Sequence, residues 1–438
     1  MEYKILVVGS GAREHAIVKS LKKSTHTKKI YCIGTNLNPG IKEICENVTI
    51  GNINDSSTII SYAKYNDVKF AIIGPENPLE AGVSDDLWKC GIKVVGPKKK
   101  LAQIETSKSF TRDLFKKYQI PGGPKYQTFE TIEGVPEFFN ELENNYVVKF
   151  DGLAGGKGVK VSGEHLHNMT EATAYCQEII DKGGKFVIEE KFIGEEFSLM
   201  SFCDGKSLKH MPIVQDHKRA YENDTGPNTG GMGTYTDINH SLPFLTIEDV
   251  NQAKEMNKAT INALAKKFNE SYKGILYGGF IATADGVKLI EYNARLGDPE
   301  AMNVLSLIET DFIDICFAIT DGTLDKINVQ FNKQATVCKY VVPEGYPENP
   351  VKGEPVDISN VDNLDNLYYA SVDIHNEKLI ECGSRTIAIV GIANSISLAE
   401  TMAEKEAASI KGPLFHREDI VKDILIQKRV DNMKLLRL

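Results

Sequence analysis

The sequence predicts a multidomain protein of mixed α/β and α+β class, with an N-terminal domain built on a parallel sheet. Three observations favour this fold. The chain has 438 residues, more than one hydrophobic core usually serves. Strand-like and helix-like stretches alternate before residue 105. The composition then changes from about residue 105 to about residue 325, and we expect domains at residues 1–104, 105–328 and 329–438.

In the N-terminal region, β-rich runs at residues 4–8, 29–33, 69–73 and 92–95 predict strands, and residues 15–21 predict a helix. This alternation is typical of parallel strands joined by crossover helices. Each strand-like run ends in turn residues rich in glycine, proline or asparagine. Ligands of such sheets bind at the carboxyl ends of the strands, so these turns are candidate binding loops.

The middle region combines longer helical segments, glycine-rich turns and alternating strands such as 184–190 and 274–284. Most chemistry-bearing residues lie here. A proline-rich passage at 343–355 introduces a tail with short strand patterns at 367–372 and 386–390 and an alanine-rich helix after Ser397. We expect this tail to form a small α+β domain.

The first candidate loop is GSGARE at residues 9–14, which follows a strand and opens a helix. Backbone N–H groups and a helix N-terminus can hold a phosphate in this context. A dinucleotide fingerprint would place a third glycine where Glu14 stands and an acidic residue after the second strand, where Gly34, Thr35 and Asn36 are found. Nicotinamide binding is therefore disfavoured. The alternative is a tight turn without a ligand.

A second loop, KFDGLAGGKGV at residues 149–159, contains four glycines and two lysines between strand-like flanks. Glycines let the backbone approach phosphate oxygens, and lysines offset their charge. The loop lacks the Ser or Thr and the following helix of a Walker loop. The alternative is a hairpin with exposed lysines.

Carboxylates follow two further strands. Glu189 and Glu190 end one strand, and Glu195 and Glu196 follow a turn; these side chains could accept hydrogen bonds from ribose hydroxyls, or be solvated strand ends. Residues 291–300, EYNARLGDPE, follow the strand-like run 287–290. Strand alternation places Glu291 and Asn293 on one face, where their oxygens suit magnesium. Arg295 suits a carboxylate or phosphate. The alternative is a polar face on an edge strand.

The segments QDHKR at 215–219 and DTGPNTGGMG at 224–233 combine many glycines with polar groups. Backbone amides of residues 229–233 could bind an anion, and Asp216 could face an ammonium group. His217 is either a base or, as is more common for a lone histidine, a hydrogen-bonding fixture.

Net charge, cysteine spacing and the lengths of apolar runs limit the classes of partner and the cellular compartment that we expect. A net charge of −9 and a pI near 5.6 disfavour nucleic acid as a main partner. The eight cysteines show no zinc-ligand or redox spacing, which favours free thiols in a reducing compartment. The first apolar run stops at Gly9, far short of a signal peptide or a membrane span, so we expect a cytoplasmic protein with no membrane partner.

Taken together, these motifs resemble those of the ATP-grasp ligases and, among them, the phosphoribosylamine–glycine ligases. The resemblance runs from the first strand to the C-terminal helix. Its most specific pieces are GSGAREHA at the start, GPENPL from Gly74, DGLAGGKGV from Asp151, QDHKR with DTGPNTGGMG, and EYNARLGDPE. It implies an N-terminal α/β (pre-ATP-grasp) domain, an ATP-grasp domain with a mobile lid at about residues 124–194, and a C-terminal domain that completes the site.

The resemblance also implies roles for individual residues. Lys108 and Lys149 would contact ATP phosphates. The covering loop would use Gly152, Gly155, Gly156, Lys157 and Gly158, and Glu189, Glu190 and Glu196 would lie near adenine and ribose. Glu291 and Asn293 match the ligands of Mg²⁺ or Mn²⁺. Gly11, Arg13, Pro75 and Glu76 resemble the phosphoribosylamine side. Asp216 and Arg295 would hold glycine, and with Lys149 form the catalytic group. Further substrate-binding candidates are Asn228, Thr229, Gly230, Gly231, Gly297 and Asp298. Gly155 and Leu296 depart conservatively from the family pattern, which often has alanine and phenylalanine there.

The implied reaction joins glycine to 5-phosphoribosylamine through glycyl phosphate, giving glycinamide ribonucleotide, ADP and phosphate in de novo purine synthesis. ATP is a co-substrate, and the expected protein is a monomer or at most a weak dimer. No side-chain nucleophile is required, which fits the lack of a convincing Ser-His-Asp or Cys-His set. Two alternatives stay open at this level: a ligase that joins another acid, such as formate, to another amine, and a nucleotide-binding regulatory protein without catalysis.

Overall fold

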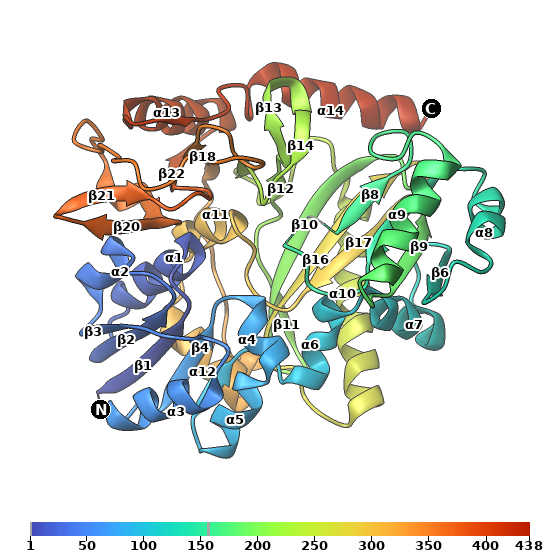
Figure 1. Cartoon of the computed structure of the whole chain (residues 1–438). Coiled ribbons are helices and arrows are strands. Elements are labelled where there is room, and N and C mark those ends of the chain that lie inside the picture. Colours follow the sequence, from blue (N-terminus) through green and yellow to red (C-terminus); the bar gives the residue numbers. More distant parts are fainter. Residues whose placement is uncertain (1, 156–157) are drawn as a thin grey trace.

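The computed structural model describes residues 2–155 and 158–438, which form several sheets flanked by helices (Figure 1). The N-terminal sheet is parallel, with strand order β3-β2-β1-β4-β5. The last four residues of β1 are fully buried, as expected for a strand covered on both faces. Its strands are β1 (Tyr3–Val8), β2 (Lys28–Gly34), β3 (Asn47–Ile50), β4 (Phe70–Ile73) and β5 (Lys93–Val95).

The predicted α/β fold of this region is confirmed, and β3 is an addition to it. None of the four residues of β3, NVTI, is fully buried, and its apolar pattern is weak. From β1 the chain builds outward to β2 and β3 and then returns to β4 on the other side of β1. The crevice at this change of direction is where ligands bind in open α/β sheets. The helices here are α1 (Ala12–Lys22), α2 (Pro39–Ile44), α3 (Ser56–Tyr65), α4 (Glu76–Ala81) and α5 (Val83–Lys89).

The middle of the molecule is an antiparallel sheet of order β11-β10-β16-β17. We call it the central sheet; its strands are β10 (Glu195–Cys203), β11 (Leu208–His210), β16 (Gly274–Thr283) and β17 (Gly286–Asn293). The helices that accompany it are α6 (Lys99–Thr106), α7 (Lys108–Tyr118), α10 (Ile247–Phe268), α11 (Glu300–Leu307) and α12 (Phe312–Asp321). Of these, α10 contacts β16 and β17, while α11 and α12 contact α1 of the N-terminal domain.

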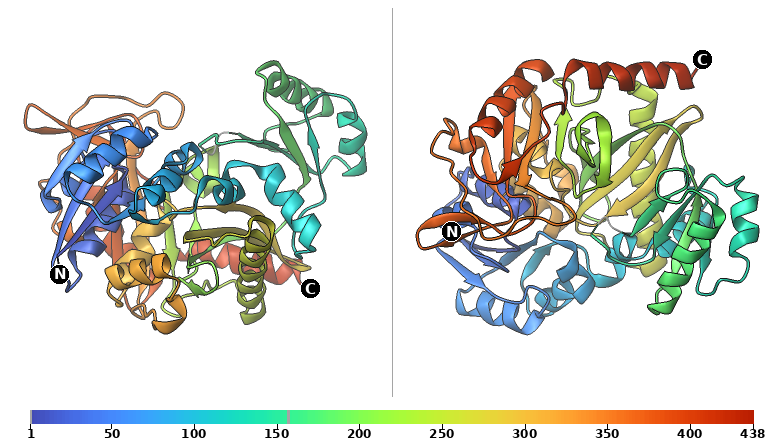
Figure 2. Two further views of the ribbon diagram at one scale, coloured as in Figure 1. Left: turned by 90° about the horizontal axis from the view of Figure 1, so that it is seen from below. Right: turned by 45° about the horizontal axis from the view of Figure 1, so that its top comes forward.

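Residues 126–190 form a separate antiparallel sheet of order β6-β9-β7-β8, which we call the lid. It consists of β6 (Tyr126–Phe129), β7 (Tyr146–Phe150), β8 (Val159–Val161) and β9 (Phe186–Glu190), with α8 (Val135–Glu141) and α9 (Met169–Asp181). In the left view of Figure 2, the green and teal segments of the lid project from the rest of the molecule. These elements have a sheet and a small core of their own, and the mobile lid expected at about residues 124–194 stays a prediction.

The C-terminal sheet has the order β12-β15-β18-β22-β19, with β23 paired to β18. It joins β12 (Gln215–Asp216) and β15 (Gly233–Thr236) to β18 (Ala335–Pro343), β19 (Leu367–Tyr369), β22 (Ile387–Ala393) and β23 (Leu414–Phe415). This sheet crosses the predicted boundary at residue 329, because β15 pairs with β18. The predicted boundaries stay a prediction of where independent folding units begin.

Two hairpins and the last helices complete this region. The hairpins are β13 (Arg219–Tyr221) with β14 (Thr225–Asn228), and β20 (Val372–His375) with β21 (Lys378–Glu381). The helices are α13 (Ile396–Ser409) and α14 (Asp423–Leu436), and short 3-10 turns occur at Glu222–Asp224, Leu324–Lys326 and Leu364–Asn366. The alanine face of α13 is buried and packs on β18 and β22, which confirms the predicted α+β character of the tail.

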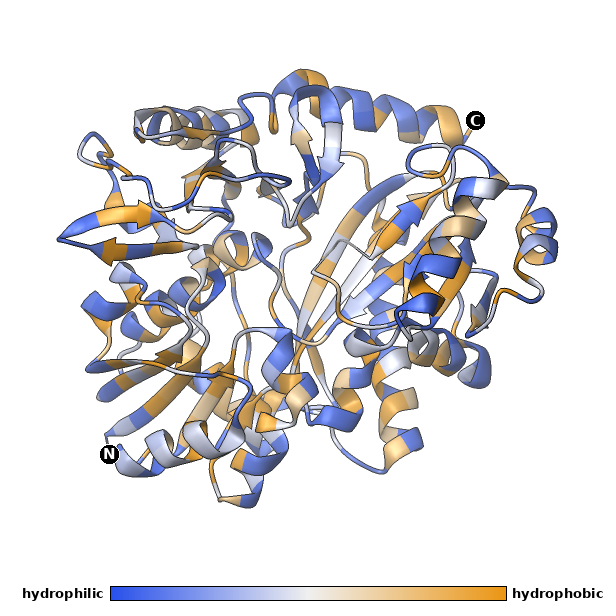
Figure 3. Ribbon diagram, in the orientation of Figure 1, coloured by the Kyte–Doolittle hydropathy of each residue, from blue (hydrophilic) through white to orange (hydrophobic). Residues whose placement is uncertain are grey.

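One large hydrophobic core runs through the N-terminal, central and C-terminal sheets, and a second, smaller core lies within the lid. Figure 3 shows the corresponding pattern, with hydrophobic colour on strands such as β1 and mostly hydrophilic colour on the outer helix α14. All eight cysteines lie within the described residues, and each is a free thiol, as predicted. None of the helices in the described ranges combines the length and apolar character needed to cross a membrane.

Candidate active site

The loops after β1 and β4 lie side by side because these strands pair in parallel. The side chain of Glu14 folds back between them, and its Oε2 accepts a hydrogen bond from the Gly11 N–H at 2.7 Å. Gly74 leaves no space for a Cβ, which would lie 2.1 Å from Glu14 Oε1. Pro75 precedes α4, and its ring closes the other side of the loop beside Gly9. Glu14 thus fills the position where a dinucleotide site would need a glycine.

Two arginines from distant parts of the chain meet above this crevice. Arg295 Nε donates to Glu76 Oε2 at 3.2 Å, and Arg13 Nη1 lies 3.9 Å from the same oxygen. Arg295 also pairs with the buried Glu105 of α6 at 3.0 Å. Burial opposes ionisation of Glu76, but the two guanidinium groups lower the pKa of its carboxyl to about 2. Arg295, which is predicted to hold the substrate glycine, therefore lies next to the residues predicted to bind phosphoribosylamine.

The predicted metal ligands lie at the end of β17. Glu291 and Asn293 are two residues apart on this strand, so their side chains share a face. Arg295 Nη2 donates to Asn293 Oδ1 at 3.2 Å. Burial raises the pKa of Glu291, but the charges of Lys218, Lys149, Lys108 and Arg295 together outweigh burial and leave its pKa below the ordinary value. An ionised carboxylate beside an amide oxygen is a donor set that Mg²⁺ or Mn²⁺ accepts.

Next to these ligands, Lys149 of β7 is buried and paired. Its Nζ lies 2.8 Å from Glu189 Oε2 and donates to the backbone carbonyl of Ile290 at 3.0 Å. Glu189 also accepts two hydrogen bonds from Arg112, from Nε to Oε1 at 2.7 Å and from Nη2 to Oε2 at 2.8 Å. Burial opposes ionisation of Glu189, yet Arg112 and Lys149 lower the pKa of its carboxyl to about 2. Glu189 thus pairs with two positively charged side chains, Arg112 and Lys149, in this structure. The adenine or ribose contact implied for Glu189 stays a prediction.

The glycine-rich loop starts from a fixed point at the N-terminus of α7. Lys108 Nζ donates to the carbonyl of Gly152 at 2.7 Å. Asp151 accepts a hydrogen bond from the Ser109 N–H at 3.2 Å and pairs with Lys185 at 3.0 Å. These contacts join the two predicted phosphate-binding elements, the first residue of α7 and the loop.

The rest of the loop closes the hairpin between β7 and β8. The Phe150 N–H donates to the carbonyl of Gly158 at 2.8 Å. Gly155 adopts a φ of 54°, which glycine reaches without strain. The predictions made for Gly156 and Lys157 fall outside the described residues.

A small cavity opens beside β17, and Asp216 of β12 is one of its walls. Asp216 Oδ1 is buried and has no hydrogen-bond partner in the described part of the chain. Burial, reinforced by the charge of Glu300, raises the pKa of Asp216 well above its ordinary value. Glu300 itself accepts a hydrogen bond from the Tyr277 hydroxyl at 2.8 Å. The cavity is lined by Glu196, Phe197, Ser198, Asp216, Lys218, Tyr277, Gly279, Phe280, Ile290 and Glu291.

The other predicted nucleotide carboxylates have partners of their own. Glu196, on the wall of this cavity, pairs with Lys218 at 2.8 Å. Glu190 lies at the lid end of the site and accepts a hydrogen bond from the Lys125 N–H at 2.7 Å. Both are partly or fully exposed, so either can exchange its partner for a ligand hydroxyl.

Arg385, from the C-terminal part of the chain, holds two predicted substrate-binding segments together. Its Nη1 donates to the carbonyl of Gly230 at 2.5 Å and to that of Gly231 at 3.3 Å. The same atom donates to the carbonyl of Asp298 at 3.0 Å. Tyr340 donates its hydroxyl to Asp298 Oδ1 at 2.6 Å and supports the Arg385 guanidinium with its ring. The remaining predicted substrate residues, Asn228, Thr229 and Gly297, lie on or next to the same segments.

His217 has a structural role in hydrogen bonding and is not available as a general base. It is 2% exposed, and its Nδ1 lies 3.3 Å from the carbonyl of Gly233. Burial lowers the pKa of His217 to about 3, so the ring stays neutral near neutral pH. Of the two interpretations of this histidine, the structure favours the hydrogen-bonding one.

Several residues of the site had no role in the sequence-based prediction. Arg112, Glu105, Glu300 and Arg385 each form an ion pair or hydrogen bond with a predicted site residue or lie beside one. Glu300 stands within the EYNARLGDPE motif, so that motif could have indicated it. The other three lie outside every glycine-rich or paired-carboxylate motif, and no local pattern marks them.

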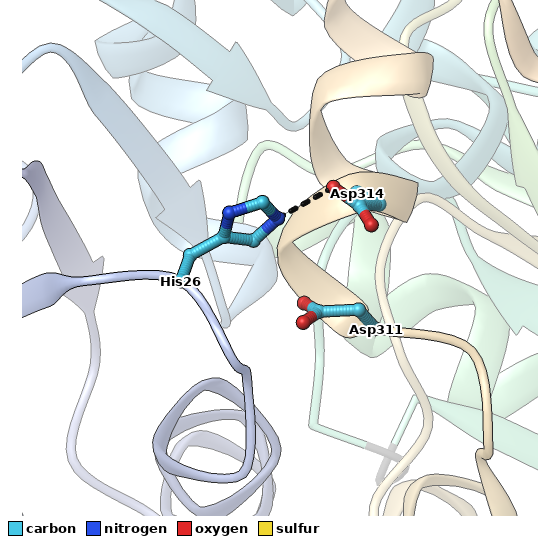
Figure 4. Close-up of side chains that lie close together, drawn as sticks. All are labelled: His26, Asp311 and Asp314. Carbon is cyan, nitrogen blue, oxygen red and sulfur yellow. Dashed lines mark hydrogen bonds and ion pairs between the residues drawn. The ribbon is translucent and has the colours of Figure 1, made fainter. Parts of the chain in front are cut away.

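A second group of potential metal ligands lies at the contact between the N-terminal domain and α12 (Figure 4). His26 Nε2 is 2.7 Å from Asp314 Oδ1. Asp311 caps α12 through the Ile313 N–H and accepts the Ser24 hydroxyl at 2.8 Å. These groups already satisfy one another, so we interpret the cluster as a polar contact that fixes α12.

Comparison with known proteins matches this architecture along nearly the whole chain. The chain matches the phosphoribosylglycinamide synthetase N domain over residues 3–105, its ATP-grasp (A) domain over 106–301 and its C domain over 336–423. It is 50% identical to a phosphoribosylamine–glycine ligase of Methanosarcina barkeri, over 99% of this chain and 100% of that protein. The chain belongs to the phosphoribosylamine–glycine ligase family.

Other members of the phosphoribosylamine–glycine ligase family show the same extent of similarity. A ligase of this name from Methanobrevibacter smithii is 47% identical over 98% of this chain and 99% of its own length. The crystal structure of the Thermotoga maritima phosphoribosylamine–glycine ligase superposes with a TM-score of 0.81 at 26% identity, covering 95% of this chain and 99% of the other. The predicted family and the ATP-grasp fold are confirmed.

Proposed function

We propose that this protein joins glycine to 5-phosphoribosylamine at the expense of ATP, giving glycinamide ribonucleotide, ADP and phosphate. One observation carries the assignment of glycine to this site. The buried Oδ1 of Asp216 has no hydrogen-bond partner among the residues that the structure describes, and Asp216 lines the same cavity as Glu291. The ammonium group of an amino acid would satisfy that oxygen, whereas formate has no group that could do so. This favours glycine over formate as the acid.

The first chemical step activates the glycine carboxylate. In this proposal Asp216 holds the ammonium group, and Arg295 orients the carboxylate toward the γ-phosphate of ATP. A carboxylate oxygen attacks that phosphorus, the bond to ADP breaks, and glycyl phosphate forms. Lys149 and Lys108 offset the charge of the phosphates, so catalysis rests on position and electrostatics.

Glu291 and Asn293 fit a divalent ion, Mg²⁺ or Mn²⁺. The fit rests on the ionised state of Glu291 among lysines and on the oxygen-only donor set. When bound, such an ion would neutralise phosphate charge. The adjacent Arg295 holds Asn293 in place through its side-chain oxygen.

The second step transfers the glycyl group. The amine of phosphoribosylamine attacks the acyl carbon, the C–O bond to phosphate breaks, and the amide forms with loss of a proton. We assign phosphoribosylamine to the crevice between the loops after β1 and β4, near Arg13 and Glu76. The lid would exclude water from the acyl phosphate in the interval.

A substrate panel tests this proposal. The purified protein with ATP, Mg²⁺ and phosphoribosylamine should release ADP with glycine and not with formate or larger amino acids. ADP release with formate and not glycine would reject the substrate, and nucleotide binding without turnover would favour a regulatory protein. We further propose a cytoplasmic protein that acts as a monomer, or at most as a weak dimer, which sedimentation of the active enzyme would test.

A further inference from the structure

A buried cluster of three charged side chains lies where the lid meets the central sheet. Arg112 of α7, Glu189 of β9 and Lys149 of β7 are 2%, 3% and 4% exposed. Glu189 binds the other two at once, with Arg112 on both of its oxygens and Lys149 on Oε2. A carboxylate that receives three charge-assisted hydrogen bonds has little freedom to move.

The cluster has a second anchor outside the lid. The backbone carbonyl of Ile290 accepts from Lys149 Nζ at 3.0 Å and from Arg112 Nη2 at 2.6 Å. Ile290 directly precedes Glu291 in β17. The ammonium of Lys149 is therefore fixed to a lid strand on one side and to the strand of the predicted metal ligands on the other.

Hydrogen-bond capacity shows what remains for a ligand. An ammonium group has three N–H donors, and Lys149 uses two of them on Glu189 and Ile290. Glu291 lies close enough to interact with Lys149, so the cluster and this neighbour together carry two positive and two negative charges. The third N–H of Lys149 has no acceptor among the described residues, which leaves one donor for a ligand oxygen.

We propose that Arg112 and Glu189 are positioning residues that fix the Lys149 ammonium, with its third N–H directed to an oxygen of the nucleotide phosphates. The inference rests on the proposed ligase function. Arg112 acts through Glu189 and Ile290, which accept from its Nε and Nη2, while its buried Nη1 has no hydrogen-bond partner among the described residues. A lysine at position 112 would keep the charge but could not bind both oxygens of Glu189 and the Ile290 carbonyl together.

The test is the variant Arg112→Lys, assayed in full-length protein after the wild type has shown glycine-dependent ADP release. We expect kcat to fall about 10- to 100-fold, the range for losing a hydrogen bond to a charged group. The KM for ATP should rise, while the KM values for glycine and phosphoribosylamine stay within about twofold, since a uniform structural defect would move all three.

A matched control is Arg437→Lys. Arg437 binds both oxygens of Asp249, at 2.9 and 2.7 Å, and has no contact with Lys149 in the described residues. It should lose stability while kcat stays within about twofold, because only its contacts with Asp249 and with the Thr283 carbonyl, both outside the site, change. If Arg112→Lys behaves like this control, with a lower unfolding temperature and unchanged kinetics, the positioning role is wrong.

A second variant covers the case in which Arg112→Lys does not fold. Glu189→Asp keeps the charge and shortens the side chain, so it should also lower kcat and raise the KM for ATP alone. Wild-type kinetics in a folded Glu189→Asp protein would overturn the inference. Absence of glycine-dependent ADP release from the wild type would instead reject the proposed function.

Discussion

The lid and the rest of the molecule differ in how their hydrophobic cores are organised. The lid has its own hydrophobic core, which includes Phe129, Phe139 and Phe186. The N-terminal, central and C-terminal sheets share one continuous core. The contact between the two units carries buried charged groups, above all Arg112, Glu189 and Lys149. The N-terminal, central and C-terminal sheets, which we call the body, are therefore packed on one core, and the contact between the body and the lid includes the buried charges on which the proposed chemistry depends.

The largest effect should come from replacing Glu291, the predicted metal ligand on β17 of the central sheet. Glu291→Ala removes the proposed metal-binding carboxylate and should lower kcat roughly a thousandfold, since a metal ion supplies several kcal/mol of charge stabilisation. The unfolding temperature should change little because Glu291 is only partly buried. Steady-state kinetics and calorimetry measure both. Lys288→Ala on the same strand is the control and should retain activity; full activity of Glu291→Ala would contradict the metal assignment.

The separation of the two cores predicts a local effect for a lid mutation. Phe186 is fully buried and stacks on Phe129 at a centroid distance of 5.6 Å. Phe186→Ala should destabilise the lid by about 3–5 kcal/mol. Hydrogen exchange should then speed up in residues 126–190 and not elsewhere. Phe280→Ala, in the body core, should instead loosen all three body sheets; equal exchange patterns for both variants would refute the separation of the cores.

A smaller effect is expected where the C-terminal sheet supports the glycine site. Arg385→Met keeps apolar contact with Tyr340 but removes the donors to Gly230, Gly231 and Asp298. The KM for glycine should rise about tenfold, which corresponds to roughly 1.4 kcal/mol. The KM for ATP should not change, because Arg385 contacts no lid residue among those described. A selective rise in the KM for ATP would show that the assignment of this loop is wrong.

The smallest effect concerns acid stability. The pKa of Glu189 is lowered from 4.5 to about 2. A depressed carboxyl pKa contributes stability above pH 4.5, and this contribution is lost as the pH falls toward 2. In Glu189→Gln, denaturation midpoints should therefore fall less steeply over this window than in the wild type. Equal pH dependence of the midpoints in Glu189→Gln and the wild type would show that Arg112 and Lys149 do not lower the pKa of Glu189.

The sequence indicates most of the fold because its signals are local. Apolar runs mark β1 and β4, and the loops after them had to meet once the strands were parallel. Strand alternation likewise placed Glu291 beside Asn293. The half-exposed β3 has no such pattern and was missed.

The rest depends on contacts between distant residues. Arg112 and Glu189 are 77 residues apart, and Arg385 is 155 residues from Gly230. Neither periodicity nor motif spacing reports which distant side chains meet, because their meeting follows from the packing of whole sheets. The same holds for β15, whose pairing with β18 joins segments that the composition assigned to different domains.

The most direct test of the central claim follows the oxygen atoms of glycine. When the carboxylate of glycine is labelled with ¹⁸O and turnover is run with ATP and phosphoribosylamine, each inorganic phosphate released should carry one labelled oxygen. That oxygen passes from carboxylate to phosphate when glycyl phosphate forms and stays there when the amine displaces it. Phosphate without label, alongside normal formation of glycinamide ribonucleotide, would contradict activation of glycine at this site.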